Sequence, residues 1–225
     1  MQAIVDGLPV DTIRIRKVNT IIRNYGFKND RWGYELAIDN VRLAETLGDV
    51  TGEAKSRWYL GLIYKSFGKY EEARDQLQSS VQLFSGLKDY TSQSAVLNEK
   101  GLLLREMLEL DEAIEAYEQA IDLALQVKDT FIVVSTMTNL GNAYRRKGDL
   151  KLAKQHAMQA LKMAEAYGQE KITGSLLINI GNQFLRENLY DSAIMYYSQA
   201  QEVQTRRKDT VELGRILSNM GLVYS

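Results

Sequence analysis

The chain has 225 residues, of which 45% are hydrophobic and 25% are charged, an ordinary balance for a folded protein. Its formal net charge of −1 gives no electrostatic reason to expect nucleic acid as a partner. The lack of cysteine excludes disulfides, thiolate nucleophiles and cysteine metal sites, and no apolar run has the length of a membrane span. The single proline, Pro9, indicates a chain that is helical over most of its length.

The first 49 residues predict an entry segment followed by one irregular pair of helices. Asp11 and Thr12 carry oxygens that can accept hydrogen bonds from free backbone amides, so they mark the start of a helix that runs to about residue 24. A second helix is expected over about residues 30–47. A terminal repeat is expected to be atypical, because one of its faces has no neighbour.

The sequence leaves the register of this first pair open. Stepping back 40 residues from Ala73 reaches Gly33, which keeps the period of the later repeats. Residues 34–37 (YELA) instead resemble residues 70–73 (YEEA), which implies a different step.

From about residue 50 onward, a period of 40 residues organises the chain. Glycine recurs at each step, as Gly61, Gly101, Gly141, Gly181 and Gly221. Alanine follows twelve residues after four of these, as Ala73, Ala113, Ala153 and Ala193. Such a period is the signature of a repeat array, and the small residues predict helices that cross closely. The predicted repeats cover residues 50–89, 90–129, 130–169 and 170–209.

Turn and cap residues fit this division. Gly68, Gly148 and Asn188 stand where a left-handed residue would end the first helix of a repeat, and Leu108 breaks this rule. Aspartates that can cap the following helix stand at four joints: Asp49, Asp89, Asp129 and Asp209. Each helix is expected to have about 16 to 18 residues.

The sequence stops one helix into a further repeat, at residues 210–225. Leu217, Gly221 and Tyr224 continue the pattern, but the helix that would pack against them is missing. Because a natural end would be a polar capping helix, we expect a fragment of a longer protein.

These repeats resemble the tetratricopeptide repeat (TPR). With each glycine as the eighth position of the motif, the eleventh is aromatic at Tyr64, Tyr144, Phe184 and Tyr224, and departs at Leu104. The period of 40 exceeds the 34 of the common TPR, and this longer form is similar to the repeats of kinesin light chains, of the mitotic-spindle adaptor LGN and of bacterial signalling proteins. Over about residues 50–225, the resemblance implies an all-α fold, a right-handed α-solenoid (superhelix) of helix-turn-helix repeats.

A second resemblance concerns residues 8–12 (LPVDT) and the irregular helix pair after them. Together they are similar to the amino-terminal TPR region of bacterial sensor histidine kinases and related regulators. That resemblance implies a periplasmic location, whereas without it we expect a cytoplasmic one.

In a TPR superhelix the first helix of each repeat lines the concave groove, and the resemblance places an asparagine ladder there. Its members are Asn139, Asn179 and Asn219, with Asn142 and Asn182 one turn further along. An asparagine amide offers a donor and an acceptor, which match the N–H and C=O of an extended peptide. The neighbouring Arg145, Arg146 and Arg186 favour acidic side chains or a carboxylate. The alternative is that the asparagines cap or bridge neighbouring repeats.

The strength of hydrogen bonds limits this hypothesis. Five asparagines would contribute roughly 3–7 kcal/mol, at about 0.5–1.5 kcal/mol for each bond, whereas micromolar binding needs about 8 kcal/mol. An apolar anchor is therefore required, and Trp58 and Tyr59 are the candidates at the other end of the groove. The alternative is that both rings only pack in the core.

Catalysis finds almost no support in the sequence. The one histidine, His156, lies on a second helix, and a catalytic triad or a histidine metal site cannot be built from it without cysteine. We therefore expect no enzyme, no cofactor and no metal. The predicted function is a protein- or peptide-binding scaffold, the recognition or sensory part of a larger signalling protein. The alternative is a structural module that self-associates through repeat ends and charged faces.

Overall fold

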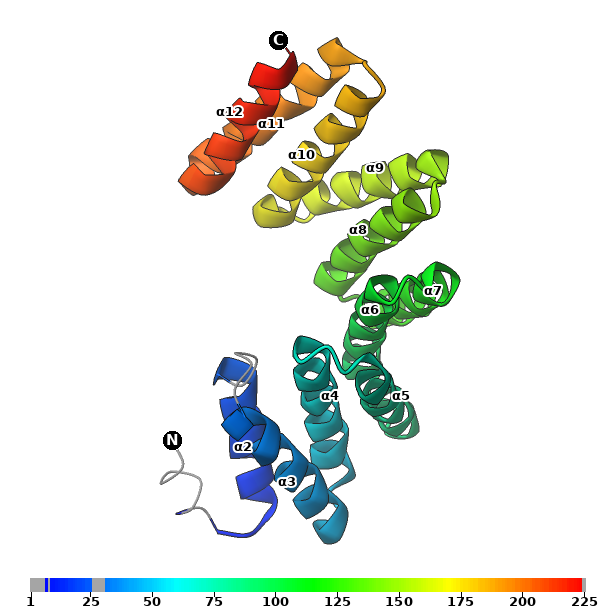
Figure 1. Ribbon diagram of the computed structural model, residues 1–225, viewed down its shortest axis with the longest axis vertical. Helices are drawn as coiled ribbons and strands as arrows, with labels where there is room; N and C mark the ends of the chain where they lie inside the picture. The colour runs from blue at the N-terminus through cyan, green and yellow to red at the C-terminus, as the bar shows by residue number, and fades with distance from the viewer. Residues whose placement is uncertain (1–6, 8, 26–30, 224–225) are drawn as a thin grey trace. The chain divides into compact units, whose positions relative to one another are not determined.

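The computed structural model describes residues 7, 9–25 and 31–223, and within them every regular element is an α-helix (Figure 1). The helices are α2 (Thr12–Tyr25), α3 (Arg31–Leu47), α4 (Val50–Ser66), α5 (Tyr70–Gly86), α6 (Tyr90–Glu106), α7 (Leu110–Gln126), α8 (Thr130–Lys147), α9 (Leu150–Ala166), α10 (Glu170–Arg186), α11 (Tyr190–Arg207) and α12 (Thr210–Val223). The expected helix start at residue 30 and the aromatic residue Tyr224 fall outside the described residues.

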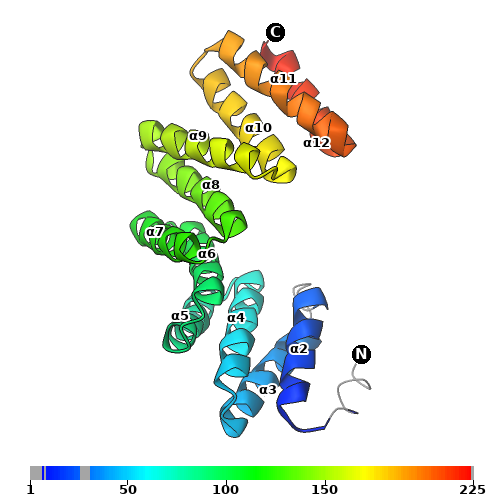
Figure 2. The same ribbon diagram turned by 180° about the vertical axis from the view of Figure 1, so that it is seen from behind.

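Contacts between helices divide the chain into two compact units, Met1–Val127 and Lys128–Ser225. In the first unit, α4 packs on α5 and α6 on α7, while α2 lies against both α3 and α4. In the second unit, α8 packs on α9 and α10 on α11, and α12 follows α11. Both ribbon views show the two helices of each pair side by side, joined by a short turn (Figure 2). Each unit is therefore built from the same helix-turn-helix element.

Aspartates cap the helices as predicted. At each of the four predicted joints, Oδ1 accepts a hydrogen bond from the backbone amide three residues ahead, at 2.9–3.2 Å. Asp11 caps α2 in the same way, with amides of residues 13 and 14 at 2.9 and 3.0 Å. These bonds satisfy amides that the first turn of a helix leaves without a partner.

The turns between helices use left-handed residues, and glycine is not required for them. Gly68 and Gly148 have φ of 72° and 92°, and Asn188 has φ of 56°, as the sequence predicts. Leu108 is not a residue type that favours a left-handed turn, yet it adopts the same left-handed conformation, with φ of 67°. A branched side chain at this φ is strained, so the repeat imposes the turn on a residue that disfavours it.

Glycine at the period of 40 brings paired helices close together. At Gly101 a Cβ atom would lie 2.5 Å from Cε1 of Tyr117, and at Gly181 it would lie 2.6 Å from Cε1 of Tyr197. Both tyrosines are fully buried. The glycines therefore make room for a ring from the second helix of the pair.

Burial on α3 bears on the open register of the first helix pair. The buried residues Gly33, Ala37, Asn40, Val41 and Ala44 have counterparts exactly one period later on α5, which are buried too: Ala73, Leu77, Ser80, Val81 and Phe84. This coincidence favours the step of 40 for α3.

Candidate functional site

The second unit contains a cavity formed by α8, the start of α9, and α10. Its volume is about 160 Å³, and it is lined by Asn142, Arg145, Leu150, Asn179, Asn182, Gln183, Arg186 and Glu187. On α10, Asn179, Asn182 and Arg186 follow one another at intervals of three and four residues, which places them on one face of the helix. Five of the ten residues predicted for the groove, Asn142, Arg145, Asn179, Asn182 and Arg186, therefore meet in one cavity.

The amides of this cavity fall into two classes. Asn182 Oδ1 accepts hydrogen bonds from the Tyr197 hydroxyl at 2.7 Å and from Asn219 Nδ2 at 2.9 Å. The side chains of Asn142 and Asn179 have no hydrogen-bond partner among the residues that the structure describes. Each of these two amides can therefore offer both a donor and an acceptor to a ligand.

The charged residues at the cavity favour an anionic ligand. Arg145 and Arg186 are both exposed and both line it. The lining carboxylate, Glu187, pairs with Lys154 at 3.6 Å, and the Lys154 ammonium lies 3.8 Å from the centre of the Phe184 ring. The two guanidinium groups can form bidentate hydrogen bonds to a carboxylate.

The other predicted residues of the second unit lie outside this lining. Asn139 and Arg146 are on α8 but do not line the cavity, and Asn219 reaches it only through its bond to Asn182. Their part in a ligand site stays a prediction. Gln183 is a lining residue that the sequence did not reveal; its Nε2 donates to the Leu150 carbonyl oxygen at 3.2 Å.

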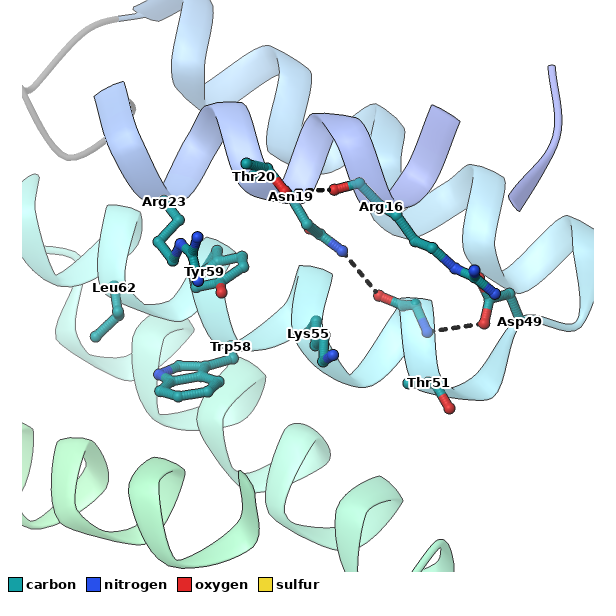
Figure 3. Close-up of a pocket in the computed structure, with 11 residues that line it drawn as sticks. Arg16, Asn19, Thr20, Arg23, Asp49, Thr51, Lys55, Trp58, Tyr59 and Leu62 are labelled. Atoms are coloured by element: carbon teal, nitrogen blue, oxygen red, sulfur yellow. Dashed lines mark hydrogen bonds between the residues drawn. The ribbon is translucent and has the colours of Figure 1, made fainter. Parts of the chain in front are cut away.

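Trp58 and Tyr59 lie in the first unit, in a larger pocket between α2 and α4 (Figure 3). Its volume is about 850 Å³. Together with Leu62, the two rings give the pocket an apolar side; they stack with centroids 5.6 Å apart and planes 17° apart. Burial raises the pKa of Tyr59, against an opposing effect of the Arg23 charge, so its hydroxyl stays neutral at physiological pH.

Cations surround this apolar side. Arg16 and Arg23 on α2 and Lys55 on α4 line the pocket and are exposed, whereas Asp49 is the one carboxylate among the lining residues that the structure describes. Arg23 lies next to Tyr59 in the close-up view (Figure 3). The pocket therefore suits an apolar side chain with an anionic neighbour.

The α2 residues of this pocket were missed by the sequence analysis. The register of the first helix pair was open, so no groove positions could be assigned on α2. A signal was present nonetheless, since Arg16, Asn19, Thr20 and Arg23 are spaced three, four and seven residues apart.

A buried polar network fixes α2 against α4. Asn40 Nδ2 donates to Asn19 Oδ1 at 3.0 Å and to Ser56 Oγ at 2.9 Å, and Asn19 Nδ2 donates to the Gly52 carbonyl oxygen at 3.4 Å. All three polar side chains are at most 5% exposed. Because buried amides are costly to leave unpaired, this network holds the pocket in shape.

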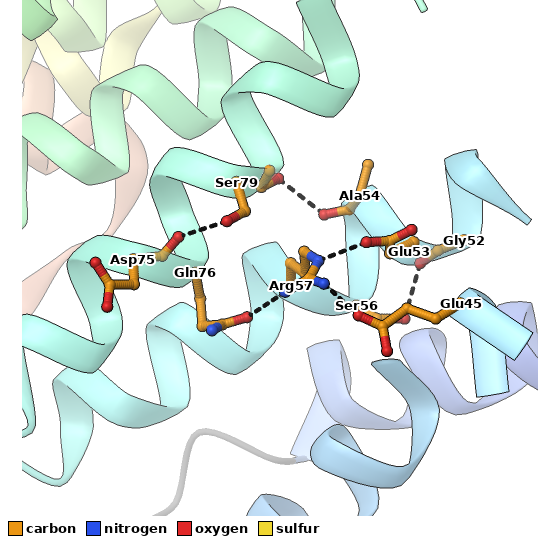
Figure 4. A network of polar contacts seen from close by, with 10 residues as sticks. Glu45, Gly52, Glu53, Ala54, Ser56, Arg57, Asp75, Gln76 and Ser79 are labelled. Carbon is orange, nitrogen blue, oxygen red and sulfur yellow. Dashed lines mark hydrogen bonds and ion pairs between the residues drawn. The ribbon is translucent and has the colours of Figure 1, made fainter. Parts of the chain in front are cut away.

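A second network joins α4 to its other neighbours (Figure 4). Arg57 Nε donates to Glu53 at 2.7 Å, Nη1 donates to Gln76 on α5 at 3.1 Å, and Nη2 pairs with Glu45 on α3. One guanidinium thus ties three helices together, which fixes the backbone next to Trp58.

A comparison with protein families identifies the repeat. Residues 92–166 match the family model described as tetratricopeptide repeat. These matched residues carry TPR repeats. No curated protein sequence matches the chain.

Solved TPR structures resemble the chain in fold. A putative kinesin light chain of Podosopora anserina with nearly identical TPR-like repeats has a TM-score of 0.72 at 16% identity, covering 87% of this chain and 96% of its own. The apo form of RapI has a TM-score of 0.77 at 14% identity, covering 86% of this chain and 54% of RapI. The Rap conjugation regulator of plasmid pLS20 with the Phr* peptide has a TM-score of 0.64 at 14% identity, covering 82% and 51%.

These likenesses confirm the predicted all-α fold of TPR helix pairs. The chain spans about half the length of the two Rap structures. None of the three structures is described as a histidine kinase, so that resemblance gains no support from them. Within the described residues, no group of three or more His, Cys, Asp or Glu side chains could hold a metal ion, and no helix is long and apolar enough to span a membrane.

Proposed function

We propose that this chain binds an extended peptide segment of a partner protein, with the α8–α10 cavity as the site that reads the peptide backbone. The observation that carries the proposal is a pair of amides, Asn142 and Asn179, that have no hydrogen-bond partner among the described residues and lie beside the exposed Arg186. TPR repeats generally serve as scaffolds and not as enzymes, and one structural neighbour is described in complex with a peptide.

The proposed ligand carries acidic residues. The guanidinium groups of Arg145 and Arg186 would pair with its carboxylates. In the first unit, the pocket of Trp58 and Tyr59 would take an apolar side chain flanked by an acidic residue, since Arg16, Arg23 and Lys55 line the same pocket. The proposal includes that this chain is the recognition part of a larger signalling protein, which would use such sites to bind its partner.

An array of acetylated, amidated octapeptides, half of them acidic, tests the proposal. Asn142→Ala with Asn179→Ala should lower binding about fivefold to 150-fold, because the loss of two hydrogen bonds of about 0.5–1.5 kcal/mol each costs about 1–3 kcal/mol. Gln155→Ala is the matched control, as it removes an exposed carboxamide on α9 outside the cavity. Equal binding by the double variant and by wild type would reject the cavity as the site.

Self-association is the second candidate, and the surface of α12 favours it. Val211, Leu217 and Leu222 on this helix are 80%, 55% and 63% exposed. A Cβ atom at Gly221 would meet no described atom within 4 Å, although the equivalent glycines are covered by a second helix. Light scattering over a concentration series separates the two roles, because a monomer at high concentration excludes self-assembly as the main function.

A further inference from the structure

Two sets of residues, one period of 40 apart, differ at the candidate cavity. The first set is Asn142, Ala157 and Asn179, and the second is Asn182, Tyr197 and Asn219. In the second set the tyrosine hydroxyl and the last asparagine both bond to the first asparagine. In the first set alanine replaces the tyrosine, and neither asparagine has a partner in the described part of the chain.

In the second set, two hydrogen bonds occupy the carbonyl oxygen of the Asn182 amide. A carbonyl oxygen has two lone pairs, and Asn182 Oδ1 accepts from the Tyr197 hydroxyl at 2.7 Å and from Asn219 Nδ2 at 2.9 Å. The donors come from α11 and α12, so two helices hold the amide from its oxygen side. Only its N–H groups are left for a ligand.

Burial makes this arrangement hard to reverse. The Tyr197 ring is fully buried against Gly181, where it lies within 2.6 Å of the position that a Cβ atom would take. The ring therefore cannot swing away from Asn182. Burial also raises the pKa of Tyr197, against an opposing effect of Arg186, which keeps the hydroxyl protonated and able to donate.

We infer that Tyr197 and Asn219 are positioning residues that make Asn182 a donor-only contact, so that the cavity requires a hydrogen-bond acceptor of the ligand at this point. The acceptor is a peptide carbonyl or a side-chain carboxylate. Asn142 and Asn179 have no such restraint and adapt to donors or acceptors. The cavity thus has one fixed end and one adaptable end, which gives a bound peptide a preferred direction. The use of this donor rests on the proposed function, whereas the orientation of the amide does not.

Hydrogen exchange of the side-chain amides, followed by NMR, tests the orientation without a ligand. We expect the bonded Asn219 protons to be protected and the Asn182 protons to exchange rapidly. Tyr197→Phe should weaken the protection at Asn219 about threefold to tenfold, because it removes one of two bonds that hold the shared oxygen. Tyr196→Phe is the control, since its hydroxyl contacts only the Met158 sulfur among the described atoms. Protection at Asn182 in place of Asn219, or no response to Tyr197→Phe, overturns the inference.

A second arm uses the octapeptide array. Asn182→Asp keeps an oxygen for Tyr197 and Asn219 but replaces the donor in the cavity with an acceptor, so bound octapeptides should lose at least tenfold in affinity. Asn142→Asp should lose less, because Asn142 is not restricted to donation. Equal losses for the two variants overturn the donor-only assignment. If no octapeptide binds wild type, the proposed function fails, and the exchange measurement still decides the orientation of Asn182.

Discussion

The helix pairs α6–α7 and α10–α11, one in each unit, are built alike but use their central tyrosine differently. In both, the ring packs on a glycine of the first helix, Gly101 or Gly181. The Tyr197 hydroxyl donates to Asn182, whereas the Tyr117 hydroxyl is buried without a partner in the described residues. Leu102 stands where the second unit has Asn182.

This difference shows that the tyrosine ring and the tyrosine hydroxyl have separate roles, the ring in packing and the hydroxyl at the cavity. The ring fills the same space in both pairs, so the tyrosine is needed for packing in each. Only in the second unit does an asparagine give its hydroxyl a partner, and that asparagine lines the cavity. Asn182 therefore has two roles. Its Oδ1 accepts the hydrogen bond of the buried Tyr197 hydroxyl, and that bond fixes the orientation of the Asn182 amide in the cavity.

The largest expected effect comes from filling the glycine positions. Gly181→Ala should destabilise the second unit by about 1–3 kcal/mol, because the new methyl group would overlap the buried Tyr197 ring. Gly141→Ala is the matched variant: its nearest contact is the Ala153 backbone oxygen at 3.2 Å, and the better helix propensity of alanine offsets the crowding. Urea unfolding measures both. Equal losses would show that the rings do not set the spacing of the helices.

Alkaline pH should weaken both pairs. Burial raises the pKa of Tyr117 and of Tyr197 above the 10.0 of a free tyrosine. The unfolded chain therefore releases these protons first, so stability is complete below pH 10 and falls as the pH rises further, by about 1.4 kcal/mol per pH unit for each such tyrosine. Tyr117→Phe should make the free energy of unfolding fall less steeply with pH, by up to about 1.4 kcal/mol per pH unit, as measured by urea unfolding at several pH values between 9 and 11. An unchanged slope contradicts the prediction.

Removal of the hydroxyl alone should distinguish the pairs. Tyr197→Phe should cost about 0.5–1.5 kcal/mol, because a hydrogen bond is lost and the Asn182 oxygen keeps one donor only. Tyr117→Phe should be neutral or stabilising, since it deletes a buried hydroxyl that has no partner among the described residues. Backbone hydrogen exchange in α10–α11 and in α6–α7 reports on each pair separately. A loss at Tyr117 equal to that at Tyr197 would remove the distinction between the pairs.

The smallest effect concerns the turns of the same two pairs. Leu108→Gly should stabilise the α6–α7 turn by about 0.5–1 kcal/mol, because leucine is strained at its φ of 67°. Asn188→Gly should change the α10–α11 turn by only a few tenths of a kcal/mol, since asparagine tolerates its φ of 56°. The melting temperatures of the two variants test this order, and a drop on Leu108→Gly would show that the leucine makes a stabilising contact that outweighs the strain.

The sequence by itself determined the repeat. Small residues at a period of 40 mark where two helices can pack closely, because a larger side chain would not fit there. Aspartates mark where helices begin, because their side chains accept hydrogen bonds from the amides of the first turn. Five of the predicted groove residues lie in one cavity because residues three or four apart share a helix face, and the repeat returns each face to the same side.

Tertiary structure alone decided what those residues can do. The sequence gives Asn142 and Asn182 equal status, since they occupy the same repeat position. They differ because a residue fifteen positions later is Ala157 in one repeat and Tyr197 in the other, and only packing brings that hydroxyl to 2.7 Å from Asn182. The pocket between α2 and α4 could not be predicted either. The first repeat departs from the common pattern, so its residues could be assigned to repeat positions only from the packed helices.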